Sequence, residues 1–221
     1  MSLTATAQST SNFIPCPAGM HLARCIQIID LGTQKGDWQG KEIENKQVRI
    51  TWETPNELIT YTNKEGEEVT KPYVISKDYT CSLGEKARLR ADLQTWRGKP
   101  FTEEELEGFN LSQLLGKVCQ VQIIHKPAKN GNVYANVGSV NPLMKGMVEP
   151  EQVNPSICFN LAEFDGKIFD SLPTWLQEKI KLSPEYKTIT NPEQIEAGKD
   201  VVSNGELPDI NIDEINIQMP F

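Results

Sequence analysis

Residues 82–98, SLGEKARLRADLQTWRG, interrupt a chain whose neighbouring segments on both sides have the character of β-strands. Apolar residues recur in this stretch at mixed spacings of three and four, which is the period of one helix face. Ser82 can act as an N-cap, and Gly98 supplies the residue type with which helices often end. We therefore predict a helix inserted between two groups of strands, followed by a second short helix in TEEELEGF at residues 102–109.

The segments before this helix predict three strands. MHLARCIQIIDL at 20–31 is rich in β-branched and other apolar residues, and GTQKGDWQGKE at 32–42 has the glycines of a loop or a wide hairpin connection. In IENKQVRITWETP at 43–55, apolar and polar residues alternate, which is the period of a strand with one solvent-facing side. We expect Pro55 to end this strand and residues 57–76 to form a hairpin that turns at KEGEE.

Two more strands are expected after the helical insertion. KVCQVQIIHKP at 117–127 and VYANVGSVNPL at 133–143 flank the Asn-Gly pair at 130–131, a strong signal for a tight hairpin turn. Five strands with a helix between the third and the fourth is the plan of an OB-fold, a small, partly open Greek-key barrel. An SH3-like barrel or a small sandwich would share much of this pattern, but the helix before the last hairpin favours the OB-fold. We therefore predict a mainly β, OB-fold-like five-stranded barrel over residues 17–145, preceded by a flexible arm at 1–16.

The rest of the chain divides into an extension and a tail. Residues 146–192 are interrupted by prolines and contain one amphipathic helix candidate, SLPTWLQEKIKL at 171–182, in which Pro173 suits the first helical turn. Residues 193–221 contain seven acidic residues and one lysine, a net charge of −6, so we expect a disordered acidic tail. Since the whole chain carries −8, residues 1–192 carry only −2, and a nearly neutral barrel can still hold a basic groove.

The composition indicates the cellular compartment of the protein and the state of its cysteines. It has no apolar run near the ~20 residues of a membrane-spanning helix and no secretory or transit signal, so we expect a cytoplasmic protein without membrane contact. Its two histidines are far apart and its cysteines form no CxxC pair, so we expect neither a zinc site nor any other cofactor. We expect buried free thiols, typical of a reducing cytosol, at Cys16, Cys25, Cys81, Cys119 and Cys158.

The C-terminal tip is the most informative short segment for function. From Pro208 onward acidic residues alternate with isoleucine and asparagine, and the chain closes on Met-Pro-Phe. A partner protein could hold the ring of a terminal phenylalanine in an apolar pocket and its carboxylate with a basic side chain, while the proline lowers the cost of ordering the tip. A purely solubilising tail is the alternative, although such a tail would stay polar to its end. The predicted docking residues are Asp209, Asp213, Glu214, Met219, Pro220 and Phe221.

Both the tail and the predicted barrel resemble those of a known protein family. The tail resembles that of bacterial and phage single-stranded-DNA-binding proteins, which end in an acidic stretch and an Ile-Pro-Phe-like tip, although here Met219 replaces the aliphatic residue and Gln218 stands where an acid is common. Residues 17–145 are similar to phage-encoded single-strand binders of the OB type, through GTQKGDWQGKE with RITWETP and through SLGEKARLRADLQTWRGKPFTEEEL. The resemblance implies a protein that coats and protects unwound DNA during replication, recombination and repair in a bacterial host cytosol. It also implies that the tail recruits replication and recombination proteins.

Single-strand binding needs a positive track for phosphates and flat side chains for base stacking. We expect such residues on the second and third strands and in the flanking loops, where OB-folds hold their ligands. Trp52 and Trp96 lie in the apolar phase of their segments instead, and we expect them in the core. The candidate ssDNA-binding residues are Lys35, Trp38, Lys46, Arg49, Lys71, Tyr73, Lys77, Tyr79, Lys126, Lys129 and Tyr134.

The sequence lacks the motifs of common enzyme classes. It has no GxxxxGK[ST], GxGxxG, HExxH or GxSxG pattern, and no plausible nucleophile accompanies either histidine, so we expect no catalytic residues. Three hypotheses remain. The first is sequence-tolerant binding of single-stranded DNA, and the second is an OB-like module that binds another protein, as an inhibitor or an assembly factor. The third is a metal-dependent nuclease, which would need acids converging from strands that are poor in them. A homo-oligomer is compatible with any of the three.

Overall fold

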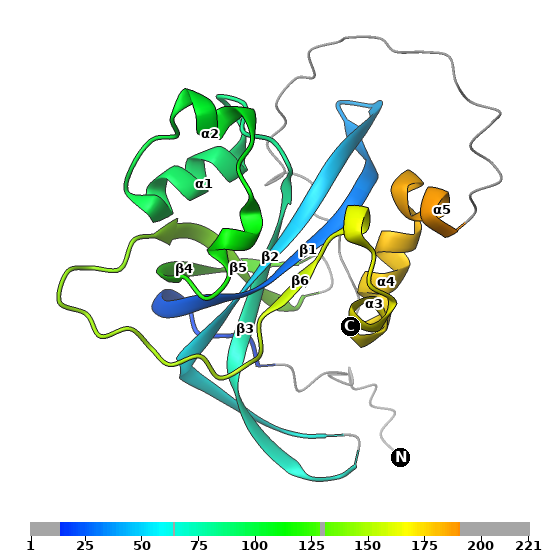
Figure 1. Cartoon of the computed structure of the whole chain (residues 1–221). Helices are drawn as coiled ribbons and strands as arrows, with labels where there is room; N and C mark the ends of the chain where they lie inside the picture. The colour runs from blue at the N-terminus through cyan, green and yellow to red at the C-terminus, as the bar shows by residue number, and fades with distance from the viewer. Residues whose placement is uncertain (1–13, 64, 129–130, 191–221) are drawn as a thin grey trace, which may run out of the picture.

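The computed structural model describes residues 14–63, 65–128 and 131–190 of the 221-residue chain. Five antiparallel strands curl into an OB-like half-barrel with a few short helices around it, which confirms the predicted fold class (Figure 1). The predicted disorder of residues 193–221 lies outside the described residues. None of the helices within these ranges has the length and apolar character that crossing a membrane requires. The strands are β1 (Gly19–Trp38), β2 (Lys41–Thr62), β3 (Glu68–Thr80), β4 (Val118–Pro127) and β5 (Val133–Asn141).

The half-barrel curls around one apolar core. The strand order is β3-β2-β1-β4-β5, and β3 and β5, at the two ends of this order, lie close to each other. Side chains alternate between the two faces of a strand, so one phase of each strand points inward. Trp52 and Trp96 both lie in this core, as predicted, with ring centroids 6.0 Å apart. The inward residues include Ala23, Cys25, Ile28, Val48, Ile50, Ile75, Cys119, Val121, Ile123, Val137 and Val140.

The hairpin between β1 and β2 is longer than the sequence suggests. The segment at 32–42, predicted as a loop or a wide hairpin connection, consists of strand on both sides of a two-residue turn at Gln39 and Gly40. Both turn residues have positive φ angles, 51° and 78°. Positive φ at both central positions is the geometry of the hairpin turn whose twist matches that of the paired strands. The glycine-rich segment therefore extends the sheet instead of interrupting it.

β2 also continues past Pro55, where the sequence predicted its end. Pro55 lies in a register irregularity between Thr54 and Leu58, so it has no partner on β3 that would need its missing N–H. Beyond this point β2 and β3 pair only with each other as far as the turn around Gly66, which the sequence predicted. Residues 58–62 and 68–72 thus form a two-stranded arm that projects from the barrel (Figure 1).

The predicted helical insertion lies between β3 and β4. It contains α1 (Arg88–Arg97), α2 (Glu103–Glu107) and the short 3-10 helix η1 (Leu111–Leu114). α1 ends at Gly98, which has a left-handed φ of 67°, as predicted, but it begins six residues later than Ser82. Ser82 instead accepts a hydrogen bond from the N–H of Gly84 at 3.1 Å, which makes a local turn. Thr102 caps α2 in a reciprocal capping box with Glu105.

Residues 146–190, called the extension below, pack on β1; their helices lie on the other side of β1 from β4 and β5, whereas the loop before β6 passes on the same side as these strands (Figure 1). β6 pairs with β1 in parallel, matching Gln27 with Ile157. A second core joins Ile29 and Leu31 of β1 to Phe159, Leu161, Phe169, Leu172, Leu176 and Ile180. The helix predicted in 171–182 is present as α4 and begins directly after Pro173. The elements are β6 (Ile157–Phe159), η2 (Leu161–Glu163), α3 (Gly166–Ser171), α4 (Thr174–Lys181) and α5 (Pro184–Thr190).

All five cysteines are free thiols, but they are not all buried as the sequence predicted. Cys16, Cys25 and Cys119 lie in the barrel core, and burial raises the pKa of Cys25 to about 12. Cys81 and Cys158 are exposed. Cys81 follows the end of β3, and Cys158 occupies the outward phase of β6 between Ile157 and Phe159. The short apolar segments that contain these two residues do not bury every side chain.

Candidate nucleic-acid interface

Two of the predicted interface residues lie on the inner side of the barrel. The register of β2 with β3 pairs Val48 with Tyr79 and Ile50 with Lys77, so both β3 residues share the inward phase. Tyr79 is 2% exposed, and the Lys77 side chain is 12% exposed. The Tyr79 hydroxyl and the Lys77 ammonium both contact the carboxylate of Asp92 on α1, at 2.8 and 3.2 Å. In this position the side chains of these two predicted interface residues hold α1 against the barrel and do not face outward.

Tyr73 shares the same phase of β3 and lies partly buried against the barrel core. Burial raises the pKa of the Tyr73 hydroxyl and raises that of Tyr79 well above the usual range, with a further contribution from the neighbouring Asp92 at Tyr79. Both side chains therefore remain neutral at ordinary pH. Neither ring presents an open face on the outer surface of β3, where a base would stack.

The outward phase of β2 and β3 faces the extension. Arg49 forms an ion pair with Asp78 across the two strands at 2.8 Å, and its guanidinium carbon lies 4.7 Å from the centre of the Trp175 ring on α4. Lys179, also on α4, reaches the same Asp78 at 2.8 Å. Arg49, a predicted phosphate contact, is therefore engaged between β3 and α4.

The loop before β6 covers the same face farther along β2. Glu53 is fully buried and accepts hydrogen bonds from the backbone N–H groups of Val153 and Asn154, both at 2.8 Å. The side-chain amide of Asn154 donates a third, at 2.7 Å. A carboxylate can be buried only when such donors replace its water. Since Arg49 and Glu53 share one phase of β2, the extension covers this outer face at both positions.

The hairpin between β1 and β2 carries three of the predicted interface residues: Lys35, Trp38 and Lys46. Lys35 is exposed, but its ammonium lies 2.6 Å from Glu42 and 3.6 Å from Glu44. The ammonium of Lys46 lies 3.4 Å from Asp30. Trp38 is the last residue of β1. Because acidic neighbours balance both lysines, this hairpin adds little net positive charge.

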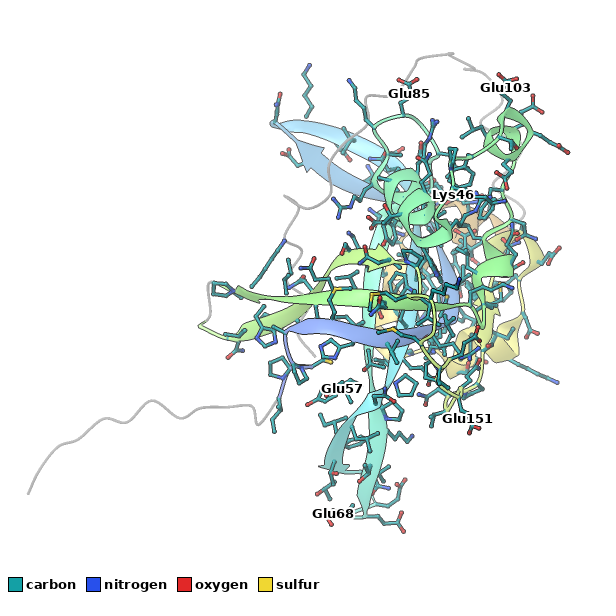
Figure 2. The ribbon with its side chains drawn as sticks, turned by 90° about the vertical axis from the view of Figure 1, so that its left-hand side faces the viewer. Lys46, Glu57, Glu68, Glu85, Glu103 and Glu151 are labelled. Carbon is teal, nitrogen blue, oxygen red and sulfur yellow. The ribbon has the colours of Figure 1, made fainter. Side chains whose placement is uncertain are left out.

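Lys71 lies on the arm, apart from the other candidates. It is exposed and pairs in register with Ile59, near an acidic turn that contains Glu67 and Glu68 (Figure 2). The arm also exposes two large apolar side chains, Leu58 at 59% and Tyr61 at 43%. One lysine beside an acidic turn is a poor phosphate track, so the arm suits contacts with protein better than contacts with DNA.

The hairpin of β4 and β5 brings Lys126 and Tyr134 together as predicted neighbours of one turn. They are direct register partners, and both occupy the outward phase, because Val121 and Ile123 fill the inward phase of β4. Lys126 is exposed. Lys129, the third candidate here, lies outside the described residues. A lysine beside an aromatic ring on an outer sheet face offers a phosphate contact and a stacking surface at one place.

Other polar residues, which were not among the predicted interface residues, line the same face. Gln122 is exposed on β4, and the hydroxyl of Ser139 donates to its side-chain oxygen at 3.3 Å. Asn136 lies opposite Ile124, and Met20 of β1 lies opposite Gln122 and is 50% exposed. We call the set of Met20, Gln122, Lys126, Tyr134, Asn136 and Ser139 the β4–β5 outer face.

The charge around this face separates it from the rest of the molecule. The chain has 30 acidic residues among 221, yet residues 108–148 contain none, while they contain four lysines and one histidine. This stretch includes all of β4 and β5. Its missing acids were visible in the sequence. The absence of acidic residues over 108–148 could have identified this hairpin as a candidate interface. Gln122 and Asn136 carry no charge, so neither residue by itself gives such a signal.

The described residues contain no group of three or more His, Cys, Asp and Glu side chains that could hold a metal ion. The predicted docking residues Asp209, Asp213, Glu214, Met219, Pro220 and Phe221 all lie outside the described residues. No protein-family model matches the chain, and no curated protein matches it. The geometry and charge of the barrel therefore carry the functional information.

Proposed function

We propose that this protein binds single-stranded DNA, coating and protecting it during replication and recombination. The observation that supports this proposal best is the acid-free stretch at 108–148, which folds into the β4–β5 hairpin of an OB-like barrel in a chain with a net charge of −8. A surface without carboxylates does not repel phosphates, so a few lysines suffice to attract a strand. OB-folds are frequent binders of oligonucleotides, which adds a fold-level analogy.

The side chains on this hairpin fit a ligand that has exposed bases. Tyr134 is the register partner of Lys126 in the outward phase of this hairpin, and stacking of a base on a tyrosine ring contributes roughly 1–3 kcal/mol. In a duplex the faces of the bases are covered by their neighbours, so a stacking contact favours single strands. We propose the tail at 193–221 as the segment that docks replication and recombination proteins, on the basis of its acidic sequence and its Met-Pro-Phe end.

Fluorescence anisotropy with a labelled oligo(dT) of about 30 nucleotides tests this function. The full chain is titrated at two salt concentrations, with a labelled duplex of the same length as the control. We expect tight binding to the single strand, weak binding to the duplex, and an affinity that falls steeply with salt. Absence of single-strand binding at low salt would refute the proposal.

A second candidate function, an interaction module for another protein, is favoured by one specific observation. The arm exposes Leu58 and Tyr61 next to an acidic turn, and its two strands pair only with each other. Exposed apolar side chains on a projecting hairpin are typical of protein contacts. The substitutions Leu58→Ser and Tyr61→Ser would abolish such a contact, measured by the oligomeric state or by capture of a partner, and would leave DNA binding unchanged.

A further inference from the structure

OB-folds commonly hold oligonucleotides on the outer face of their second and third strands. In this chain that face is occupied by the extension. Arg49 and Asp78 of β2 and β3 are bound to Trp175 and Lys179 of α4, and Glu53 is buried under residues 153–154. A strand of DNA could reach this face only after these contacts were broken.

The extension is built into the barrel and is not a loose cover. Its second core buries Ile29 and Leu31 of β1, and β6 hydrogen-bonds to β1 as a sixth strand. Gly32 allows a close approach, because a Cβ at this position would lie 2.5 Å from the side chain of Ser183. Removing the extension would expose an apolar core and leave the Glu53 carboxylate without its donors, both of which cost several kcal/mol at least.

The β4–β5 outer face lies away from the helices of the extension, whose first loop reaches only the neighbouring end of β1, where the carbonyl oxygen of Pro150 accepts hydrogen bonds from Arg24. In Figure 1 the helices of the extension lie to the right of β1 and β2, whereas β4 and β5 lie to the left. In Figure 2 the same two strands project together with the beginning of β1, clear of the helices. No acidic residue occurs in β4 or β5.

We propose that single-stranded DNA crosses the β4–β5 outer face, and that the extension permanently occupies the face of β2 and β3. This inference rests on the proposed function and assigns its site. Lys126 contacts a phosphate, Tyr134 stacks on a base, and Gln122, Asn136 and Ser139 supply amide and hydroxyl groups for phosphates or base edges.

The backbone favours a flat surface at the centre of this face. β5 has a register irregularity at Gly138, and a Cβ there would lie 3.2 Å from the side chains of both Gln122 and Ile124. Glycine therefore lets the side chains of Gln122 and Ile124 pack closely against β5 between Asn136 and Ser139. At the edge of the same strand, the guanidinium of Arg88 donates to the carbonyl oxygen of Gly138 at 2.7 Å, while it also forms an ion pair with Asp92 at 2.9 Å.

Matched substitutions test the position of the site. Gln122→Glu adds one negative charge to the face, keeps the acceptor for Ser139 and changes the side-chain volume little. Its control is Asn160→Asp, which adds the same charge to the extension and keeps the acceptor for the N–H of Ala162. Lys126→Glu is compared with Lys71→Glu, an equal charge reversal of an exposed strand lysine on the arm.

We expect Gln122→Glu to lower the affinity for oligo(dT) about threefold or more and Lys126→Glu about tenfold, with a shallower salt dependence for the latter. The variants Asn160→Asp and Lys71→Glu should retain the affinity of the unchanged protein within about twofold. Equal losses in the controls, or no loss in Gln122→Glu and Lys126→Glu, would overturn the assigned site while leaving single-strand binding itself intact. If the unchanged protein does not bind oligo(dT), the proposed function fails, and this site fails with it.

Hydrogen exchange distinguishes a fixed extension from one that DNA displaces. The N–H groups of Val153 and Asn154 bind Glu53, so their exchange is slow only while the extension covers β2. We expect their protection to be equal with and without saturating oligo(dT). Faster exchange in the complex would show that DNA opens the face of β2 and β3, and it would overturn this inference.

Discussion

The carboxylate of Glu53 on β2 binds Asn154 of the extension twice, through the backbone N–H at 2.8 Å and through the side-chain amide at 2.7 Å. Val153 contributes a third N–H donor at 2.8 Å. In the substitution Glu53→Gln, an amide group replaces one acceptor oxygen and faces these donors. We expect the free energy of unfolding to fall by about 2 kcal/mol, measured by urea denaturation.

Glu151→Gln serves as the control for this change, because Glu151 is exposed on the same loop. Its free energy of unfolding should change by no more than about 0.5 kcal/mol. Equal stability of Glu53→Gln and the unchanged protein would mean that the loop does not depend on this carboxylate.

Gly32 and Gly98 have the same left-handed φ of 67°, but only Gly32 has close neighbours. An alanine at Gly32 would place its Cβ 2.5 Å from Ser183 and 2.9 Å from Leu161, whereas no atom lies within 4 Å at Gly98. We expect Gly98→Ala to cost about 1 kcal/mol through backbone strain alone and Gly32→Ala roughly 2 to 5 kcal/mol. Thermal unfolding of the two variants measures the difference, and similar losses would contradict the close packing of α4 and α5 on β1.

Stability at acidic pH depends on the contact of Glu185 on α5 with Thr33 on β1. Burial opposes ionisation of Glu185, but hydrogen bonds from the hydroxyl and the N–H of Thr33, at 2.6 and 2.9 Å, outweigh it and lower the pKa below its usual 4.5. A lowered carboxyl pKa contributes stability that is complete above the unfolded value and is lost as the pH falls through the folded value. We therefore expect the urea midpoint of Glu185→Gln to fall less between about pH 6 and pH 3 than the urea midpoint of the unchanged protein. Parallel curves for the two proteins would refute this contribution.

Deletion of residues 193–221 removes a net charge of −6. If single-stranded DNA binds to the barrel as proposed, a tail of this charge would compete with it for the same positive groups, so we expect the deletion to tighten binding of oligo(dT) at low salt and to have little effect at high salt. A full-length variant with Asn and Gln in place of the seven tail acids separates charge from length. Unchanged affinity of both variants at low salt would exclude this competition.

The succession of the five barrel strands along the chain was predictable, because local sequence patterns mark each strand. Alternation around Ile50 marks the inward phase of β2, and the glycine at 131 with its neighbouring asparagine marks the last turn. The end of β2 was not predictable from Pro55. The consequences of a proline depend on whether a neighbouring strand needs its N–H, and that depends on register between segments far apart in sequence.

The candidate site was only partly predictable, for a similar reason. In YVISKDYT at 73–80, Ile75 shares its phase with Lys77 and Tyr79, so the sequence already contained the signal that these two residues point inward. No comparable signal announces that α4 covers Arg49. That contact joins residues 126 positions apart, Arg49 and Trp175, and it follows from tertiary packing alone.

β1 takes part in both apolar cores, with Ile28 in the barrel and Ile29 in the core of the extension. Two cores that share one strand cannot unfold independently, because the loss of either core exposes buried side chains that hold β1 in place. The barrel and the extension should therefore unfold in a single cooperative transition. A fragment cut at residue 145 would expose Ile29 and Leu31 to water and would tend to aggregate. The smallest fragment that keeps the native fold accordingly extends to α5, and in evolution the two parts can be exchanged only together.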